Sequence, residues 1–231
     1  MCIRDRDGIK VADNGKCLMP PTTSETINNF VATPINSEQL ASPAAAENNR
    51  VIDALDGQLI TNQSSHPCKV ENGLAVADTQ HDILKIVVIN RYGPADPAIA
   101  FIRGFGLKSG AFASSVAHDS HNVVAVGTND DDLTAAINAV IAEKGGLSVS
   151  SDGQTSVLPL PVAGLMSTES CQWVAERYEK LDQQVKKMGS GLRAPYMTLS
   201  FMALLVIPSL KLSDKGLFDG DNFTFTSVFT D

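Results

Sequence analysis

The sequence predicts an α+β fold in which a mixed β-sheet is covered by at least two amphipathic helices and preceded by a short β remnant. Short apolar runs bounded by Gly, Asp, Asn or Pro recur between residues 51 and 160, as expected for strands. Two longer segments place apolar residues at steps of three and four, as expected for helices that cover a sheet. Hydrophobic residues make up 43% of the 231 positions and charged residues 19%, so the chain can bury a substantial core.

Residues 1–49 are predicted to form the β remnant and a linker. Residues 8–18 indicate two short strands joined by Asp13-Asn14-Gly15, because this turn supplies the positive φ angles of a tight hairpin. Residues 20–49 are rich in Pro, Ser, Thr, Asn and Ala, which indicates a linker or a segment draped over another domain. We therefore place a boundary near Asn49 and expect residues 50–231 to form the α+β domain.

The sheet is predicted mainly from the nearly continuous apolar run Ile83–Ile89, which is typical of a strand covered on both faces. Residues 51–54 and 57–60 carry an earlier apolar signal. Further strands are expected at residues 98–102, 111–117, 123–127, 146–150 and 155–160, which gives a sheet of about five or six strands. The run Phe201–Ile207 is too short for a membrane span, which needs roughly 20 apolar residues. It is expected to be a buried strand or a short core segment.

Two amphipathic helices are predicted, over residues 130–144 and 168–188. The buried stripe of the first is formed by Leu133, Ala136, Ile137, Val140 and Ile141. The buried stripe of the second is formed by Cys171, Val174, Tyr178, Leu181, Val185 and Met188. Thr128 or Asn129 is expected to cap the first helix, and Gly145 and Gly189 are expected to follow the two C-terminal ends.

Charge and targeting signals limit the partners and the compartment. With 18 basic and 26 acidic side chains the formal net charge is −8, which disfavours nucleic acid as a partner. The N-terminal residues mix both charge signs and lack an apolar stretch, so we expect no signal peptide and no membrane partner. Four widely spaced cysteines predict neither a disulfide framework nor a C-x-x-C site. Together these features predict a cytoplasmic protein.

The densest group of chemically active residue types is the segment SSVAHDSHN, residues 114–122, which lies between two predicted strands. His118, Asp119 and His121 are types that bind metals, but they are too close in sequence for one metal to take all three. A Ser-His-Asp triad fits poorly, because adjacent His118 and Asp119 project in different directions from an extended backbone. The segment is predicted either as a turn that satisfies its own backbone or as groups that face a site.

Two other segments were weighed as binding sites. Gly104-Phe105-Gly106 matches a phosphate loop only loosely, and no helix follows directly, so a strand that turns back is expected. The predicted helix start at residue 130 carries three aspartates that would repel a phosphate, so dinucleotide binding is disfavoured. Residues 159–166 are apolar and rigid, and they form either a buried crossover from sheet to helix or a wall of a ligand or subunit pocket.

Four segments carry a resemblance to a known family: GFGLKSGA at residues 104–111, SSVAHDSHN at 114–122, LPLPVAGLMS at 158–167 and MTLSF at 197–201. In order and spacing they resemble the C-terminal domain of the bacterial adenine deaminases, over residues 51–219. Residues 8–18 are similar to the strands that follow the barrel in the amidohydrolase superfamily and return to its small β domain. The chain thus looks like the C-terminal part of a longer enzyme.

The resemblance implies hydrolysis of adenine to hypoxanthine and ammonia, as in purine salvage, by a metal-bound hydroxide in an amidohydrolase barrel with a two-metal centre of manganese or iron. The family's metal ligands, which include an H-x-H pair, match no residues of this chain. We therefore expect no metal bound by this chain and no activity of the chain alone. The implied partners are its own N-terminal amidohydrolase barrel, adenine and, in a homo-oligomer, further copies of the enzyme.

The resemblance also implies site residues. Roles facing the active site, in which a side chain hydrogen-bonds the purine or shields it from water, fall to His118, Asp119, His121 and Asn122. Roles in substrate binding fall to Ser115 and Ser120. The alternative from another class is a noncatalytic module that supports assembly or binds a purine without turning it over. An independent hydrolase built on residues 115–121 would cleave esters or amides, which we do not expect.

Overall fold

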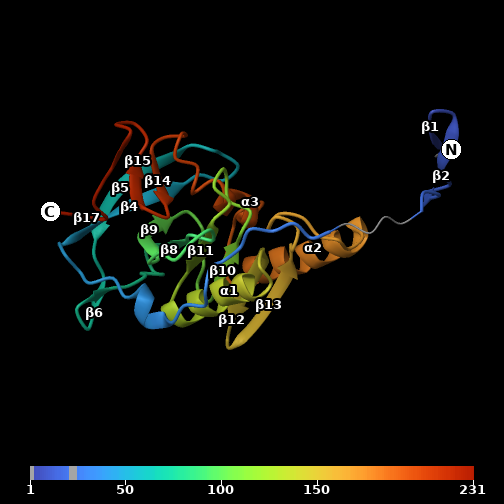
Figure 1. Ribbon diagram of the computed structural model, residues 1–231. Coiled ribbons are helices and arrows are strands. Elements are labelled where there is room, and N and C mark those ends of the chain that lie inside the picture. Colours follow the sequence, from blue (N-terminus) through green and yellow to red (C-terminus); the bar gives the residue numbers. More distant parts are fainter. Residues whose placement is uncertain (1–2, 21–24) are drawn as a thin grey trace.

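The computed structural model describes residues 3–20 and 25–231, and its centre is a nine-stranded mixed β-sheet (Figure 1). Its strands are β4 (Asn48–Ala54), β5 (Thr61–Pro67), β8 (Leu84–Ile89), β9 (Ala98–Arg103), β10 (Ala111–Ser114), β11 (Val123–Gly127), β12 (Gly146–Ser151), β13 (Gln154–Pro159) and β17 (Phe229–Thr230). They lie in the order β13-β12-β10-β11-β8-β9-β4-β17, and β5 pairs with β4. β4 and β9 are parallel, whereas the other pairs are antiparallel. The predicted mixed sheet is confirmed.

Most apolar runs of the sequence coincide with β4 and with β8 to β13, whereas residues 57–60 lie in the turn between β4 and β5. The expectation of five or six strands is too low. β5 has the sequence TNQSSHP and mostly exposed or half-buried side chains, because it lies off the main path of the sheet and pairs with β4 alone. β17 has only two residues. Strands at the periphery of a sheet need no buried face, so hydrophobic patterning does not reveal them.

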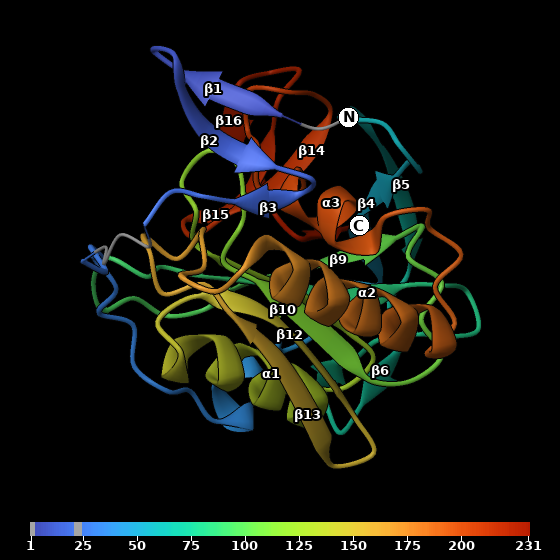
Figure 2. The same ribbon diagram turned by 90° about the vertical axis from the view of Figure 1, so that its right-hand side faces the viewer.

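Two apolar layers enclose the sheet. On one face Val87 and Ile89 of β8 pack in a cluster with α1 (Asp130–Ala142). On the other face Ile86 and Val88 pack with α2 (Cys171–Lys187) and α3 (Pro195–Ser200). Figure 2 shows the two longer helices, α1 and α2, on opposite faces of the sheet. Successive side chains of a strand point to opposite faces, so one continuous apolar run serves both layers. The predicted cover of at least two amphipathic helices is confirmed.

The two predicted helices end close to the expected residues. Asn129 caps α1, because its Oδ1 accepts a hydrogen bond from the Asp132 amide at 2.8 Å. Ser170 caps α2 in the same way through the Trp173 amide. In α2, Leu181 and Val185 are buried as predicted, whereas Val174 and Tyr178 are half-buried and Cys171 is exposed.

The N-terminal segment forms a separate three-stranded sheet of β1 (Arg4–Arg6), β2 (Ile9–Asp13) and β3 (Lys16–Cys17). The predicted hairpin is confirmed, since β2 and β3 pair around Asn14 and Gly15, whose φ angles are +46° and +78°. Its side chains are exposed or half-buried, and the sheet lies away from the rest of the molecule in Figure 1. This small sheet has no core of its own.

Residues 25–47 have little regular structure beyond the 3-10 helix η1 (Ser37–Leu40), but they are packed on the α+β domain. Phe30 and Leu40 are buried in the α1 cluster. The Asn138 side chain of α1 exchanges two hydrogen bonds with the Ile35 backbone, at 2.8 and 2.9 Å. This segment is therefore draped over α1, which was one of the two alternatives for the linker.

Smaller elements complete the fold. They are the hairpin of β6 (Val70–Glu71) and β7 (Leu74–Ala75), and the sheet of β14 (Leu210–Ser213), β15 (Gly216–Asp219) and β16 (Thr224–Phe225). The run Phe201–Ile207 forms turns after α3 with Met202 and Ala203 buried, so the short core segment is correct and the strand is not. α3 was not predicted. No helix in the described part of the chain is long and apolar enough to cross a membrane.

Candidate functional site

The candidate site is the loop of residues 115–122, which joins the antiparallel neighbours β10 and β11. Its backbone is hydrogen-bonded at several points. The Ser115 amide donates to the Gly146 carbonyl at 3.0 Å, and the His118 amide donates to the Ser200 carbonyl at 2.8 Å. His121 lies in the left-handed region, with φ of +53°, and its amide donates to Ala117 within the loop. We call this segment the His loop.

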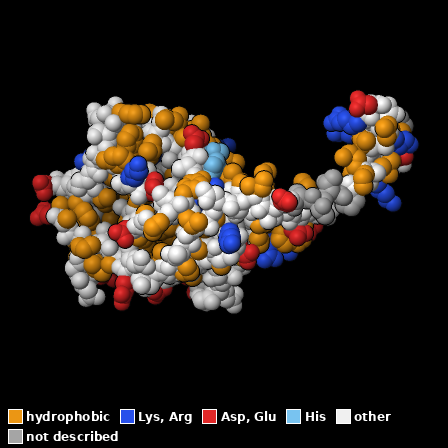
Figure 3. Space-filling view, in the orientation of Figure 1, with side chains coloured by type: hydrophobic (Ala, Val, Ile, Leu, Met, Phe, Trp, Pro, Cys, Tyr) orange, Lys and Arg blue, Asp and Glu red, His pale blue; other side chains and the backbone are white. Residues whose placement is uncertain are grey.

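The two histidines of the His loop lie together against α3. The ring of His118 stacks on that of Phe201, with centroids 4.9 Å apart and an interplanar angle of 16°. The His121 ring meets the His118 ring edge-on at 5.7 Å. Both imidazoles are half-buried, and Figure 3 shows histidine at the surface bordered by hydrophobic side chains. The loop thus presents flat aromatic surfaces next to ring nitrogens.

The electrostatic surroundings keep His121 neutral near pH 7. Burial lowers the pKa of His121, and the charges of His118 and Arg91 lower it further, while Asp119 opposes them. A neutral imidazole has one nitrogen that donates and one that accepts. The Nδ1 atom of His121 is buried and has no hydrogen-bond partner among the described residues. It is therefore a buried polar atom whose hydrogen bond the described part of the chain leaves unmade.

The other predicted site residues divide into exposed and internal ones. Asp119 and Ser120 are exposed. Asn122 is buried, and its Oδ1 accepts a hydrogen bond from the Arg91 amide at 3.2 Å. The buried Ser115 hydroxyl donates to the Gly164 carbonyl at 2.6 Å and accepts from the Gly146 amide at 2.8 Å. Ser115 and Asn122 therefore bond the backbone of other segments, whereas Asp119 and Ser120 reach solvent.

Two residues at the site were missed from sequence, Arg91 and Tyr92, which follow β8. Ile89 pairs with Val123, so the residues after β8 emerge beside the end of the His loop. Arg91 Nη2 donates to the Tyr92 hydroxyl at 2.9 Å, and that hydroxyl donates to the Ser120 carbonyl at 2.7 Å. The signal available in the sequence was a cation and an aromatic residue that follow closely on a fully buried strand, at a sheet edge where site residues often lie.

The residues that were weighed and disfavoured as a metal centre and as a phosphate loop have other surroundings in the structure. In residues 3–20 and 25–231 there is no group of three or more His, Cys, Asp or Glu that could hold a metal ion. At the glycine-rich segment the chain turns back after β9, as predicted. The amides of Gly104 and Gly106 donate to the Asp82 carboxylate at 2.8 and 2.7 Å. A carboxylate of the chain itself thus occupies the place that a phosphate would need.

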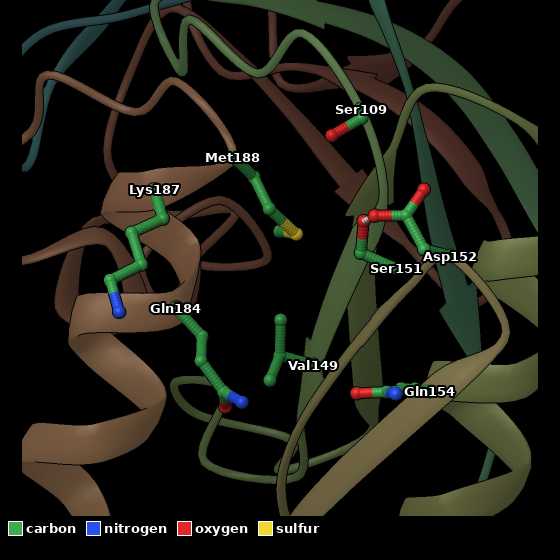
Figure 4. Close-up of a pocket in the computed structure, with 8 residues that line it drawn as sticks. All are labelled: Ser109, Val149, Ser151, Asp152, Gln154, Gln184, Lys187 and Met188. Atoms are coloured by element: carbon green, nitrogen blue, oxygen red, sulfur yellow. Dashed lines mark hydrogen bonds between the residues drawn. The ribbon is translucent and has the colours of Figure 1, made fainter.

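A hollow of about 410 Å³ lies at the opposite end of β10 from the His loop (Figure 4). It is lined by Ser109, Val149, Ser151, Asp152, Gln154, Gln184, Lys187 and Met188. Val149 and Met188 are buried, whereas Gln154, Gln184 and Lys187 are exposed. None of the lining residues belongs to the His loop, so the hollow and the loop are separate features.

Comparison with known proteins gives the class of this α+β domain. Residues 58–224 match the model of the adenine deaminase C-terminal domain. This match covers more than half of the chain, and the chain belongs to the adenine deaminase C-terminal domain family. The resemblance seen in the sequence is confirmed.

Several curated proteins named adenine deaminase are similar to the chain. That of Salinibacter ruber is 50% identical over 227 residues, which cover 97% of this chain and 42% of the relative. That of Parabacteroides distasonis is 49% identical over 222 residues, covering 96% and 41%. That of Methanosarcina barkeri is 46% identical over 231 residues, covering 96% and 42%. The chain therefore spans about two fifths of the length of these relatives.

Proposed function

We propose that this chain is the C-terminal part of an adenine deaminase, which hydrolyses adenine to hypoxanthine and ammonia for purine salvage. The observation that carries the proposal is the family match over residues 58–224, together with identities of 46–50% to proteins named adenine deaminase. The reaction consumes one water and replaces the exocyclic amino group of adenine by oxygen. The cytoplasmic location and the homo-oligomer stay predictions.

The metal chemistry belongs, in this proposal, to an N-terminal amidohydrolase barrel that these 231 residues do not supply. A centre of manganese or iron would lower the pKa of a bound water and so provide the nucleophile. His118, Asp119 and His121 do not fit this centre, because they form no metal-holding group in the described chain. We therefore derive no step of the reaction through a metal from the residues of this chain.

The His loop would form a flank of the purine site. Adenine is planar and carries both ring acceptors and an amino donor. The stacked ring of His118, the half-buried imidazole of His121 and the exposed carboxylate of Asp119 offer flat surfaces, a ring nitrogen and an acceptor. We propose that these groups, with Ser120, face the purine and exclude water. Ser115 and Asn122 would hold the loop in place through their buried hydrogen bonds.

A chimera tests the proposed function. This chain would replace the matching C-terminal 42% of the Salinibacter ruber relative, and ammonia release from adenine would be measured with manganese present. We expect the chimera to be active and the 231-residue chain alone to be inactive. A folded, metal-loaded chimera that releases no ammonia, beside an active parent, would contradict the proposal.

The same chimera separates a deaminase flank from a noncatalytic module. His118→Ala in the chimera is expected to lower kcat/KM about tenfold or more, the effect of losing one site contact. His81→Ala, at an exposed position of another loop, is the matched control. Tight binding of adenine to the isolated chain in calorimetry, with unchanged kinetics in His118→Ala, would instead favour the purine-binding module.

A further inference from the structure

Arg91 is a buried cation without a counter-ion. The residue is 5% exposed, and no carboxylate pairs with it among the described residues. Arginine does not lose its proton in proteins, so burial cannot neutralise it. Burying an unpaired charge costs several kcal/mol. Arg91 therefore needs contacts that compensate for this cost, and these contacts connect several segments of the chain.

The contacts of Arg91 join three segments that are far apart in the sequence. Its Nη1 donates to the Ala163 carbonyl, in the connection from β13 to α2, at 2.7 Å. The guanidinium carbon of Arg91 lies 5.8 Å from the centroid of the Phe30 ring, in the segment draped over α1. The backbone carbonyl of Arg91 accepts a hydrogen bond from the Val31 amide at 2.8 Å. Ring faces attract a cation, so Phe30 offsets part of the missing counter-ion.

The third segment is the His loop itself. The Arg91 amide binds the Asn122 side chain, and Arg91 Nη2 reaches the Ser120 carbonyl through the hydroxyl of Tyr92. The Tyr92 ring also lies against the guanidinium, at 4.8 Å. Two consecutive residues thus hold both ends of the three-residue stretch from Ser120 to Asn122, in which His121 adopts a positive φ.

We propose that Arg91 and Tyr92 are positioning residues, which fix the His loop in the geometry in which its two imidazoles face the substrate. That the two imidazoles face a substrate rests on the proposed function. The contacts of Arg91 and Tyr92 with the His loop, which we call the clamp, are a property of the chain and can be tested without any catalysis. Because Arg91 carries a charge, it also acts on the loop electrostatically.

The electrostatic effect of Arg91 can be measured as a change in the pKa of His121, which a merely structural role of Arg91 would leave unchanged. His121 faces His118, Arg91 and Asp119, and the positive charge of Arg91 is one of the causes that lower the pKa of His121. Removing that charge must therefore raise the pKa of His121. Replacing it by another cation of different shape must preserve part of the effect while losing the bonds of the guanidinium.

The experiment uses the 231-residue chain and the variants Arg91→Met, Arg91→Lys and Tyr92→Phe, with the four histidine signals followed by NMR across pH 5 to 8. The control is Arg177→Met, because Arg177 lies on the face of Trp173 and donates to the Val157 carbonyl but is exposed on α2. We expect the pKa of His121 to rise in Arg91→Met, to rise less in Arg91→Lys, and to stay unchanged in Arg177→Met.

Amide exchange tests the geometric part. Tyr92→Phe removes the bond to Ser120, and exchange at residues 119–122 should become about tenfold faster, the effect of losing one hydrogen bond. If Arg91→Met does not fold, Arg91→Lys and Tyr92→Phe still decide the matter. Wild-type titration of His121 and wild-type exchange in the folded variants would overturn the proposal.

The corresponding substitution in the chimera separates this proposal from the proposed function. If the NMR effects are present and Tyr92→Phe lowers kcat/KM, both hold. If the NMR effects are present but the kinetics do not change, the clamp holds and the substrate-facing role of the loop fails. If the NMR effects are absent, the clamp fails whatever the kinetics show.

Discussion

The two ends of β10 differ in how their polar side chains are held. At the end that leads into the His loop, Ser115 and Asn122 are buried, and each bonds the backbone of another segment. At the other end, beside the hollow, Gln184 and Lys187 are exposed and project from the last turns of α2 (Figure 4). The first end is cross-linked by buried bonds, whereas the second presents long side chains to solvent.

This difference teaches that cavity volume alone does not identify the site. Long exposed side chains lose rotamer entropy when a ligand fixes them, which reduces the affinity they can give. Groups already held by a second shell of hydrogen bonds avoid that cost and keep the geometry that chemistry requires. The end with the His loop is therefore the better candidate, although the hollow of about 410 Å³ lies at the other end.

The largest expected effect comes from filling the space beside Arg91. A Cβ at Gly164 would collide with Arg91 Nη1, and Gly164 has a φ of +70°. Overpacking and backbone strain together should lower the free energy of unfolding in Gly164→Ala by about 2–4 kcal/mol, measured by urea denaturation.

Gly153→Ala is the matched control for this substitution. Gly153 has a φ of +73°, but a Cβ there would meet nothing within 4 Å. It lies in the β12–β13 turn, next to the hollow, and should cost only about 1 kcal/mol of backbone strain. Equal losses at the two glycines would show that the two ends of β10 are packed alike and would remove the basis of the comparison.

A serine pair probes the hydrogen bonds at the two ends. Ser115→Ala removes the acceptor of the buried Gly146 amide and the donor to the Gly164 carbonyl, so it should lower the free energy of unfolding by about 1–3 kcal/mol. Ser151→Ala, at the hollow, removes a contact to the exposed Asp152 carboxylate and should cost less than about 0.5 kcal/mol. A loss in Ser151→Ala as large as that in Ser115→Ala would contradict the difference in preorganisation.

A third prediction concerns the pH dependence that His121 gives to the stability of the chain. Burial lowers the pKa of His121 in the folded chain, so below the ordinary value of 6.5 the unfolded chain binds more protons. The free energy of unfolding should therefore fall as pH drops from about 7.5 to 5.5. His121→Asn should reduce this fall, since Asn tolerates the positive φ of this position.

Urea denaturation at the two pH values measures the effect, and His81→Gln provides a histidine outside the loop. The pH-dependent loss of stability should shrink in His121→Asn and persist in His81→Gln. An unchanged loss in both variants would mean that the His loop does not hold an imidazole in its neutral form.

The sequence predicted the scaffold of the site better than its contacts. The continuous apolar run Ile83–Ile89 located β8, and the periodic apolar stripes of the two helices located α1 and α2. The SSVAHDSHN segment was recognised by its residue types, but no local pattern shows that Ser115 and Asn122 bond distant backbone groups. Arg91 was missed because its partners Asn122 and Ala163 lie 31 and 72 positions away along the chain.

The smallest expected effect comes from substitutions at the hollow. These substitutions also test the comparison of the two ends of β10 most directly. Lys187→Ala and Gln184→Ala remove exposed side chains without buried bonds, so each should change the free energy of unfolding by less than about 0.5 kcal/mol. In the chimera with the Salinibacter ruber relative, both variants should deaminate adenine with the kcat/KM of the parent. If either variant lowered kcat/KM as much as His118→Ala does, the substrate site would have to lie at this end of β10, because the hollow is lined by no residue of the His loop.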